Sequence, residues 1–418
     1  MPKTVKITAL DDKGRGLGEG LSYPFAYPGD EIAGEIANKR KKTGRLVSLI
    51  SGSPDRQTPP CPHFGRCGGC PWQGLKYEAQ LRLKQARVES LFGECRSIIP
   101  SPDLYYYRNR MDYAFGPDHS LGLKAEGNRI INIEKCLLMS EASNTVMAAL
   151  RHFVQSANLD IYYQRTGLMR HAVIREGKNI DNLIVNILTS DQGAFPLAEL
   201  WRELKEKTAG VSWGINLSLA DRSYGELRQT LGRDHYREVL GGLHYQVPVQ
   251  SFFQTNIKAA ENILTTVKSL IAADGAETLL DLYSGTGSIG LYLSRSVKKV
   301  IGIEEDKTAV ALSLRNAELN SIGNFSAVAG RAEDVLPGFR EKADLVVVDP
   351  PRPGLHKKVL QKLGELKAPQ IIYVSCNPLT QKNDVEVLKT FGYKIEVCQP
   401  LDLFPHTPHI ENVISLRL

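Results

Sequence analysis

The sequence predicts a multi-domain α/β protein with three parts: a small N-terminal OB-like β-barrel, an α+β middle domain and a C-terminal Rossmann-like domain. Three observations support this fold class. The length of 418 residues suits two or three domains of roughly 150 residues each. Short apolar runs separated by Gly and Pro turns fill the first part of the chain. Beyond about residue 255, apolar strands alternate with helical patterns, as in βαβ units.

The N-terminal barrel is predicted over residues 1–52. Its segments are VKITAL, GRGLGEG, FAYPGDEIAGEI and GRLVSLI. Residues 51–60 then concentrate Pro, Gly and small polar side chains, which favour turns and extended backbone over packed structure. We therefore expect a domain boundary at this point.

The middle domain is predicted over residues 53–250, where strand-like runs such as HAVIREG, NLIVNIL and WGINLSL are separated by turn residues. Near its start, a helix is predicted over about 75–93 and is expected to pack on a core, which the C-terminal domain can supply. Its apolar face would carry Tyr77, Leu81, Val88 and Leu91. Its basic residues, interpreted as a solvated face, are Lys76, Arg82, Lys84 and Arg87.

The C-terminal domain, residues 251–418, is predicted to contain a mostly parallel sheet with the strands TLLDLY, KVIGIE, DLVVVD and QIIYVS. After the first strand comes a GxGxxG pattern formed by Gly285, Gly287 and Gly290. This pattern alone fits a dinucleotide site, an S-adenosylmethionine site or a plain strand-to-helix turn.

Carboxylates around the glycine turn favour S-adenosylmethionine. This molecule has no phosphate and presents a ribose, a cationic sulfonium and an amino acid. Asp281 lies at the head of the turn, and Glu304 ends the next strand, where it can accept hydrogen bonds from ribose hydroxyls. Asp349 begins the sequence DPPRPG, which hydride transfer does not require.

Two residues late in the chain are candidates for catalysis. Cys376 directly follows the strand IIYVS, and the carboxyl end of a parallel strand is where such sheets bind ligands. The alternative is an inert buried thiol, which is how we interpret Cys95 and Cys398. Glu411 follows a turn made rigid by prolines and is a candidate base, although a lone Glu there is ordinarily a surface residue.

Composition and charge bound the class of protein. The formal net charge of +6 suits a polyanionic partner. No run of about 18 apolar residues predicts a membrane span, and the N-terminus shows no secretory signal. We therefore expect a cytoplasmic protein without disulfides.

Four cysteines, Cys61, Cys67, Cys70 and Cys136, are spaced as ligands of zinc or of an iron–sulfur cluster.

Taken in order, these motifs resemble the RNA 5-methyluridine, or uracil-5, methyltransferase family, in its TRAM-containing, iron–sulfur-bearing branch. The resemblance covers nearly the whole chain. Its motifs are TALDDKGRGLGEG, the cysteine cluster, SFFQTN, DLYSGTGSIG, IGIE, DPPRPG, SCNP and FPHTPHIEN. It implies a class I methyltransferase domain, a TRAM barrel that binds RNA, and a 4Fe-4S cluster on the four cysteines, with zinc as the alternative.

The resemblance also implies roles for single residues. Cys376 would be the nucleophile and Glu411 the general base. The residues expected to contact S-adenosylmethionine are Gln254, Tyr283, Ser288, Glu304 and Asp349, and those expected near the substrate are Phe252 and Arg352. Ser288 and Arg331 stand where relatives can carry an asparagine, so the contacts at these two positions are expected to differ.

The chemistry requires a thiolate, because carbon 5 of uracil is a poor nucleophile. Addition of the Cys376 sulfur to carbon 6 would activate carbon 5 for methylation, and a base would then remove the carbon 5 proton. We expect a monomeric enzyme acting on a flipped uridine of 23S rRNA, with tRNA as the second candidate. The alternatives are methylation of an exocyclic amine and non-catalytic RNA binding. Segments 105–110 and 169–171 are candidate RNA contacts, or simply core residues with solvated neighbours.

Overall fold

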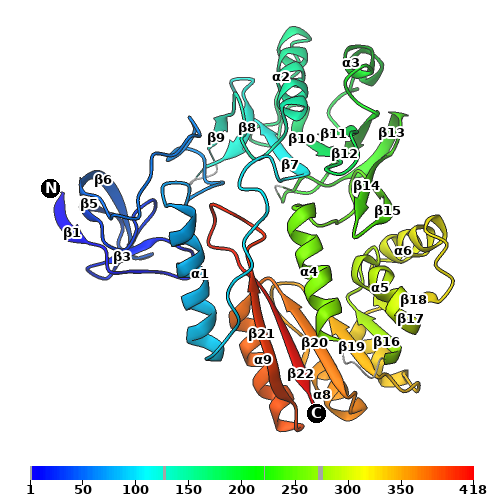
Figure 1. Cartoon of the computed structure of the whole chain (residues 1–418). Helices are drawn as coiled ribbons and strands as arrows, with labels where there is room; N and C mark the ends of the chain where they lie inside the picture. Colours follow the sequence, from blue (N-terminus) through cyan, green and yellow to red (C-terminus); the bar gives the residue numbers. More distant parts are fainter. Residues whose placement is uncertain (1, 126–128, 221, 272–275) are drawn as a thin grey trace.

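The computed structural model describes residues 2–125, 129–220, 222–271 and 276–418 (Figure 1). It contains an N-terminal sheet, a middle sheet with a hairpin, and a C-terminal sheet. The loop that leads into the last strand lies where the three parts meet (Figure 1). In the described part of the chain, no helix has the length and apolar character needed to cross a bilayer.

The N-terminal sheet confirms the predicted β-rich start of the chain. Its strands, in the order β1-β5-β6-β4-β3-β2 across the sheet, are β1 (Lys3–Lys6), β2 (Ala9–Leu10), β3 (Gly16–Gly18), β4 (Leu21–Tyr23), β5 (Glu31–Asn38) and β6 (Thr43–Ser51). The ring of Tyr23 fills its small core and requires glycine beside it. A Cβ atom on Gly34 or Gly44 would lie 2.7 or 2.1 Å from this ring.

The middle sheet is mixed, as the α+β prediction requires. Its order is β13-β12-β11-β10-β7-β8-β9, with strands β7 (Arg110–Phe115), β8 (Leu121–Lys124), β9 (Ile130–Asn132), β10 (Met169–Glu176), β11 (Leu183–Thr189), β12 (Gly210–Ile215) and β13 (Glu226–Gly232). Helices α2 (Glu141–Ser156) and α3 (Leu197–Leu204) bury their apolar faces in its core. The hairpin β14 (His235–Leu240) and β15 (Leu243–Pro248) shares a hydrophobic cluster with the C-terminal part, so the boundary predicted at residue 250 crosses a continuous core.

The C-terminal sheet has the order β18-β17-β16-β19-β20-β22-β21, in which β22 alone runs antiparallel to its neighbours. Its strands are β16 (Ala276–Leu282), β17 (Val297–Glu304), β18 (Phe325–Ala329), β19 (Leu345–Val348), β20 (Gln370–Ser375), β21 (Lys394–Leu401) and β22 (Glu411–Arg417). Its helices are α4 (Ile257–Leu270), α5 (Ser288–Leu293), α6 (Lys307–Leu319), α7 (Ala332–Val335), α8 (Lys357–Leu366) and α9 (Pro378–Thr390). This arrangement confirms the Rossmann-like prediction.

Alternate residues of one strand belong to the two faces of this sheet. Ile372 and Val374 of β20 pack in the cluster that includes α4 and α5, whereas Ile371 and Tyr373 pack in the cluster that includes α8 and α9. Both faces are therefore covered, as expected for a parallel sheet whose strands are continuously apolar.

Helix α1 (Tyr77–Phe92) lies where the sequence predicts it, but its buried face is not the predicted one. The buried residues are Ala79, Gln80, Lys84 and Val88. Val88 packs in the C-terminal core, so the expected contact with that domain is confirmed. Lys84 was predicted on a solvated face and is instead fully buried, where its Nζ lies 2.6 Å from Asp402 Oδ1. The partner comes from a remote loop that periodicity cannot reveal.

The buried ion pair leads to a prediction about stability. Replacing Lys84 by alanine leaves the Asp402 carboxylate buried without its cation, which is expected to lower the free energy of unfolding by about 3–5 kcal/mol. Denaturant titration followed by fluorescence measures this change. Arg82→Ala on the same helix is the control, because its pair with Asp55 is largely exposed and should contribute at most about 1 kcal/mol. Equal effects of the two substitutions would contradict the prediction.

Candidate active site

The glycine turn lies at the point where the order of the C-terminal sheet reverses. Strands β16, β17 and β19 meet there, and their carboxyl ends carry Tyr283, Glu304 and Asp349. Such switch points are where α/β sheets bind ligands. Tyr283 and Gly285 both adopt positive φ, at 61° and 52°, which turns the chain sharply from β16 toward α5.

Carboxylates hold this turn in place. The backbone N–H of Gly285 donates to Glu304 Oε2 at 3.0 Å, and that of Gly290 donates to Asp281 Oδ2 at 3.0 Å. Burial, aided by the charges of Asp349 and Glu304, raises the pKa of Asp281 to about 8, although the hydrogen bond from Gly290 opposes this rise. Burial likewise raises the pKa of Asp349 to about 7. The turn therefore concentrates acidic groups whose ionisation a cation would favour.

Three of the other residues predicted to contact the cofactor or the substrate lie at the first residue of a helix or in the segment before it. Ser288 is the first residue of α5, and Phe252 and Gln254 precede α4. The backbone carbonyl of Gln254 accepts a hydrogen bond from Asn109 Nδ2 at 2.8 Å, whereas the Phe252 side chain is 72% exposed. The segment before them is held by buried Arg175, which donates to the carbonyls of residues 248, 249 and 251. Binding roles for these three residues stay predictions.

Cys376 and Glu411 lie next to each other across one strand pair. The antiparallel register of β20 and β22 pairs Ser375 with Asn412, so the next positions are Cys376 on one strand and Glu411 on the other. Cys376 directly follows β20, and Asn377 then caps helix α9 by accepting a hydrogen bond from the N–H of Leu379 at 3.3 Å.

The Cys376 thiol belongs to a small cluster of acidic side chains. Burial, then the nearby charges of Glu411 and Asp349, raise the pKa of Cys376 to about 11, while Arg352 opposes them. Glu411 is 7% exposed, and burial followed by the charge of Asp349 raises its pKa well above the ordinary value. The structure thus brings together four of the predicted residues, namely Cys376, Glu411, Asp349 and Arg352.

A cavity of about 410 Å³ opens onto the thiol. Its lining from the C-terminal domain includes Arg352, Cys376, Asn377 and the loop residues 407–410. The rest of the lining comes from elsewhere: Asp12, Lys13, Gly68, Gly69, Pro71 and Arg87. Sequence reasoning did not place these residues near the site, because more than 250 residues separate them from Arg352 along the chain.

The loop before Glu411 is clamped from several sides. The N–H of His406 donates to Gln80 Oε1 at 2.7 Å, and its carbonyl accepts from the N–H of Trp72 at 2.9 Å. Its ring stacks on Tyr105 with centroids 4.7 Å apart. Lys84 also donates to the carbonyl of Phe404 at 3.1 Å. These contacts fix the backbone that delivers Glu411.

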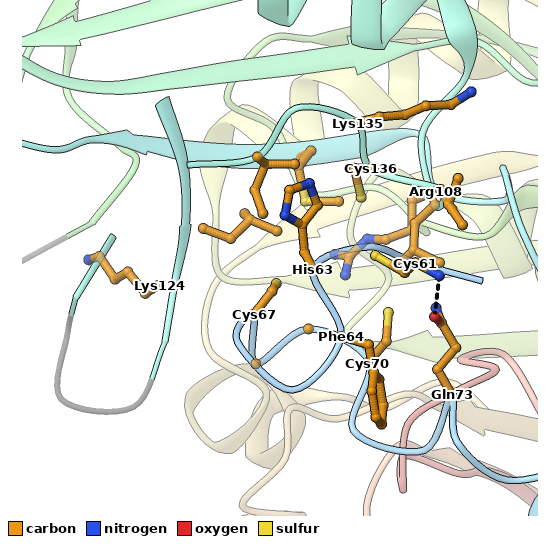
Figure 2. Close-up of a pocket in the computed structure, with 17 residues that line it drawn as sticks. Cys61, His63, Phe64, Cys67, Cys70, Gln73, Arg108, Lys124, Lys135 and Cys136 are labelled. Atoms are coloured by element: carbon orange, nitrogen blue, oxygen red, sulfur yellow. Dashed lines mark hydrogen bonds between the residues drawn. The ribbon is translucent and has the colours of Figure 1, made fainter. Parts of the chain in front are cut away.

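The four predicted metal ligands line a second cavity, of about 290 Å³ (Figure 2). Cys61, Cys67, Cys70 and Cys136 are all free thiols. Burial raises the pKa of Cys136 to about 11. A backbone hydrogen bond opposes this rise, and the neighbouring thiols add to it. Among the described residues, no set of three or more His, Cys, Asp or Glu side chains is arranged to hold a metal ion.

The candidate RNA contacts of the middle domain differ in burial. Tyr107 is buried and donates to the carbonyl of Pro405 at 3.3 Å. Arg170 is 7% exposed and donates to the carbonyl of Asn216 at 2.5 Å. His171 is buried as well, whereas Tyr106 is 43% exposed. Of the three tyrosines only Tyr107 is buried, and Arg170 is buried rather than solvated, so RNA contact by these two segments stays a prediction.

The chain is similar to known RNA methyltransferases along nearly its whole length. The family model described as tRNA (Uracil-5-)-methyltransferase matches residues 76–417. The tRNA (uracil(54)-C(5))-methyltransferase of Pyrococcus horikoshii is 36% identical, over 98% of this chain and 98% of that protein. A 23S rRNA (uracil(747)-C(5))-methyltransferase of the same organism is 35% identical, also over 98% of each chain.

A solved structure extends this similarity to the fold. It is the crystal structure of Pyrococcus abyssi tRNA (uracil-54, C5)-methyltransferase in complex with S-adenosyl-L-homocysteine. It matches with a TM-score of 0.86 and 32% identity, over 99% of this chain and 100% of that one. The aligned length therefore includes every sheet described above.

The raised pKa of Cys376 predicts how the free protein reacts with an alkylating reagent. Only the thiolate reacts, and its fraction grows about tenfold per pH unit below the pKa. The rate of carbamidomethylation of Cys376 by iodoacetamide should therefore keep rising from pH 7 to pH 10, because the pKa is about 11. Mass spectrometry of the peptide that contains Cys376 measures the rate, with Cys376→Ser as the control. A rate that levels off below pH 9 would show that the thiol is more acidic than its surroundings imply.

Proposed function

Since this chain belongs to the tRNA (uracil-5-)-methyltransferase family, we propose that Cys376 bonds covalently to the target uracil and that Glu411 is the base that releases it. The chain is an S-adenosylmethionine-dependent RNA uracil-C5 methyltransferase. The observation that supports the two residue roles is the register of β20 and β22, which puts the thiol and the carboxylate opposite each other.

The reaction then proceeds by addition, methyl transfer and elimination. The Cys376 thiolate adds to carbon 6 of uracil, and the electron pair of the carbon 5–carbon 6 double bond moves to form an enolate. Carbon 5 then takes the methyl group of S-adenosylmethionine. The S–CH3 bond breaks, its electron pair stays on the sulfur, and neutral S-adenosylhomocysteine leaves. The Glu411 carboxylate takes the proton from carbon 5, the double bond re-forms, and the Cys376 thiolate leaves.

The raised pKa values suit this order of events. In the free protein, burial and mutual repulsion favour the protonated forms of Glu411 and Cys376. A bound methyl donor carries a positively charged sulfonium, which favours ionisation of nearby acids. We infer that Gln254, Tyr283, Ser288, Glu304 and Asp349 hold this donor, and that Phe252 and Arg352 face the base.

The relatives named for a tRNA uridine and for a 23S rRNA uridine are 36% and 35% identical, so both RNAs are candidate substrates. The N-terminal sheet, as a TRAM-like barrel, is proposed to contact the RNA outside the catalytic cavity. Comparing transcripts of both kinds for incorporated 5-methyluridine identifies the substrate.

We further propose that Cys61, Cys67, Cys70 and Cys136 hold a 4Fe-4S cluster. The support is their arrangement around a cavity of about 290 Å³, which has room for a multi-atom centre. Bound iron would stabilise the thiolate forms of these buried thiols, which are otherwise costly to ionise. The cluster would tie Cys136 to the segment before α1.

Two substitutions test the roles of the thiol and the carboxylate. Cys376→Ala should abolish both methylation and the covalent complex with RNA that contains 5-fluorouridine, because no sulfur is left to add to carbon 6. Glu411→Gln should still form the adduct but release it about 10²–10⁴-fold more slowly, so that covalent complex accumulates on ordinary uridine RNA. Denaturing gels and incorporation of labelled methyl groups measure both effects.

The alternative functions give different results in the same experiment. Methylation of an exocyclic amine needs no thiolate and would survive Cys376→Ala. A non-catalytic RNA-binding protein would show no methyl transfer with the wild-type chain. Cys95→Ser is the matched control, because this partly buried thiol lies outside the cavity lining and its loss should leave turnover unchanged.

The metal centre has its own test. Protein purified without oxygen should contain about four iron and four sulfide per chain and absorb visible light. Cys136→Ser should lower the iron content sharply, whereas Cys95→Ser should not. A colourless sample that holds one zinc per chain would contradict the cluster assignment.

A further inference from the structure

The cavity above Cys376 is closed on one side by the N-terminal sheet. The turn between β2 and β3 supplies Asp12 and Lys13 to its lining. Gly14, next in the chain, accepts a hydrogen bond on its carbonyl from Trp72 Nε1 at 2.8 Å. It also lies so close to Pro408 that an added Cβ would be 2.5 Å away. The turn is therefore packed directly against the loop that delivers Glu411.

The same turn is rigid and presents its cation to the cavity. Asp11 accepts hydrogen bonds from the N–H groups of Lys13 and Arg15, each at 2.9 Å. The guanidinium of Arg15 pairs with the Asp11 carboxylate, which neutralises that acid. Lys13 forms no salt bridge with any residue that the structure describes, so its ammonium is available to a ligand.

Two further cations face the same space. Arg87 projects from α1 and reaches Asp12 only at 3.5 Å, where the Asp12 side chain is 88% exposed. Arg352 lies opposite, fixed through its carbonyl by Asn377 Nδ2 at 3.0 Å and with its own guanidinium 3.5 Å from His409 Nδ1. Desolvation, then the charge of Arg352 and, more weakly, that of Arg87, lower the pKa of His409 to about 4. The lining thus holds three cations against one exposed carboxylate.

We propose that Lys13, Arg87 and Arg352 form a binding site for the phosphodiester groups on either side of the target uridine. The proposal rests on the proposed function, in which a single uridine leaves its stack and enters this cavity. The base then reaches Cys376, and its two phosphates stay at the rim, where lysine and arginine are the side chains that bind them. The N-terminal sheet is thereby part of the substrate site itself.

Neutral backbone linkages test this site. The substrate is an RNA oligonucleotide that carries a methylphosphonate, which has no charge, on the 5′ or 3′ side of the target uridine. With wild-type enzyme, we expect kcat/KM to fall about tenfold or more for each lost contact. The double variant Lys13→Ala/Arg87→Ala should lose as much on ordinary RNA. It should then lose little more on the methylphosphonate RNA, because its phosphate contacts are already gone.

Salt dependence gives a second readout. Each lost phosphate contact should reduce the slope of log KM against log salt by about 0.7 for a single strand. Lys13→Arg keeps the positive charge at this position and should therefore keep most of the activity that Lys13→Ala loses. The matched controls are Lys298→Ala in β17 and Arg82→Ala on α1. Each removes one positive charge, as Lys13→Ala and Arg87→Ala do, but both residues lie outside the cavity lining. Both should behave as wild type.

Three outcomes would overturn the inference. One is that the double variant and the neutral linkage act independently, so that their losses multiply. Another is that the double variant changes the KM for S-adenosylmethionine and leaves that for RNA unchanged, which would assign these cations to the methyl donor. A third is that the controls lose as much as the double variant. If the wild-type chain methylates no RNA at all, the proposed function fails first, and this inference fails with it.

Discussion

The buried ion pair between Lys84 and Asp402 is the constraint on which the catalytic geometry depends. Both side chains are fully buried, so each is stable there only while the other is present. The pair joins helix α1 to the start of the loop that ends at Glu411. Gln80, one turn earlier on α1, holds the next part of this loop through His406. The position of Glu411, the proposed base, is therefore set by a helix that lies outside the C-terminal sheet.

A second consequence concerns the acidic groups around the thiol. Asp349, Glu411 and Cys376 are close enough to disfavour one another's ionised forms, and burial adds to this effect. Such a site favours the protonated forms of these groups until a positively charged ligand binds. A methyl donor with a cationic sulfur is suited to this site, because it supplies both the methyl group and the charge that favours the thiolate.

The two cavities share a wall. Gly68 and Gly69 line both the cavity above Cys376 and the cavity around the four cysteines. The turn of the N-terminal sheet packs on the opposite side through Gly14 and Pro408. Segments from the start, the middle and the end of the chain thus enclose one space. The relatives likewise match this chain over nearly its whole length rather than over the C-terminal sheet alone.

The sequence alone determined what depends on neighbouring residues. Continuous apolar runs defined the parallel strands, the glycine turn marked the expected cofactor end, and Cys376 stood out because it directly follows a strand. The tertiary structure alone decided what depends on remote partners. Lys84 looks like a surface lysine until Asp402, 318 residues away, is placed beside it. Lys13 and Arg87 likewise carry no local sign that they line a catalytic cavity, because periodicity reports which face of an element is apolar and says nothing about what that face will meet.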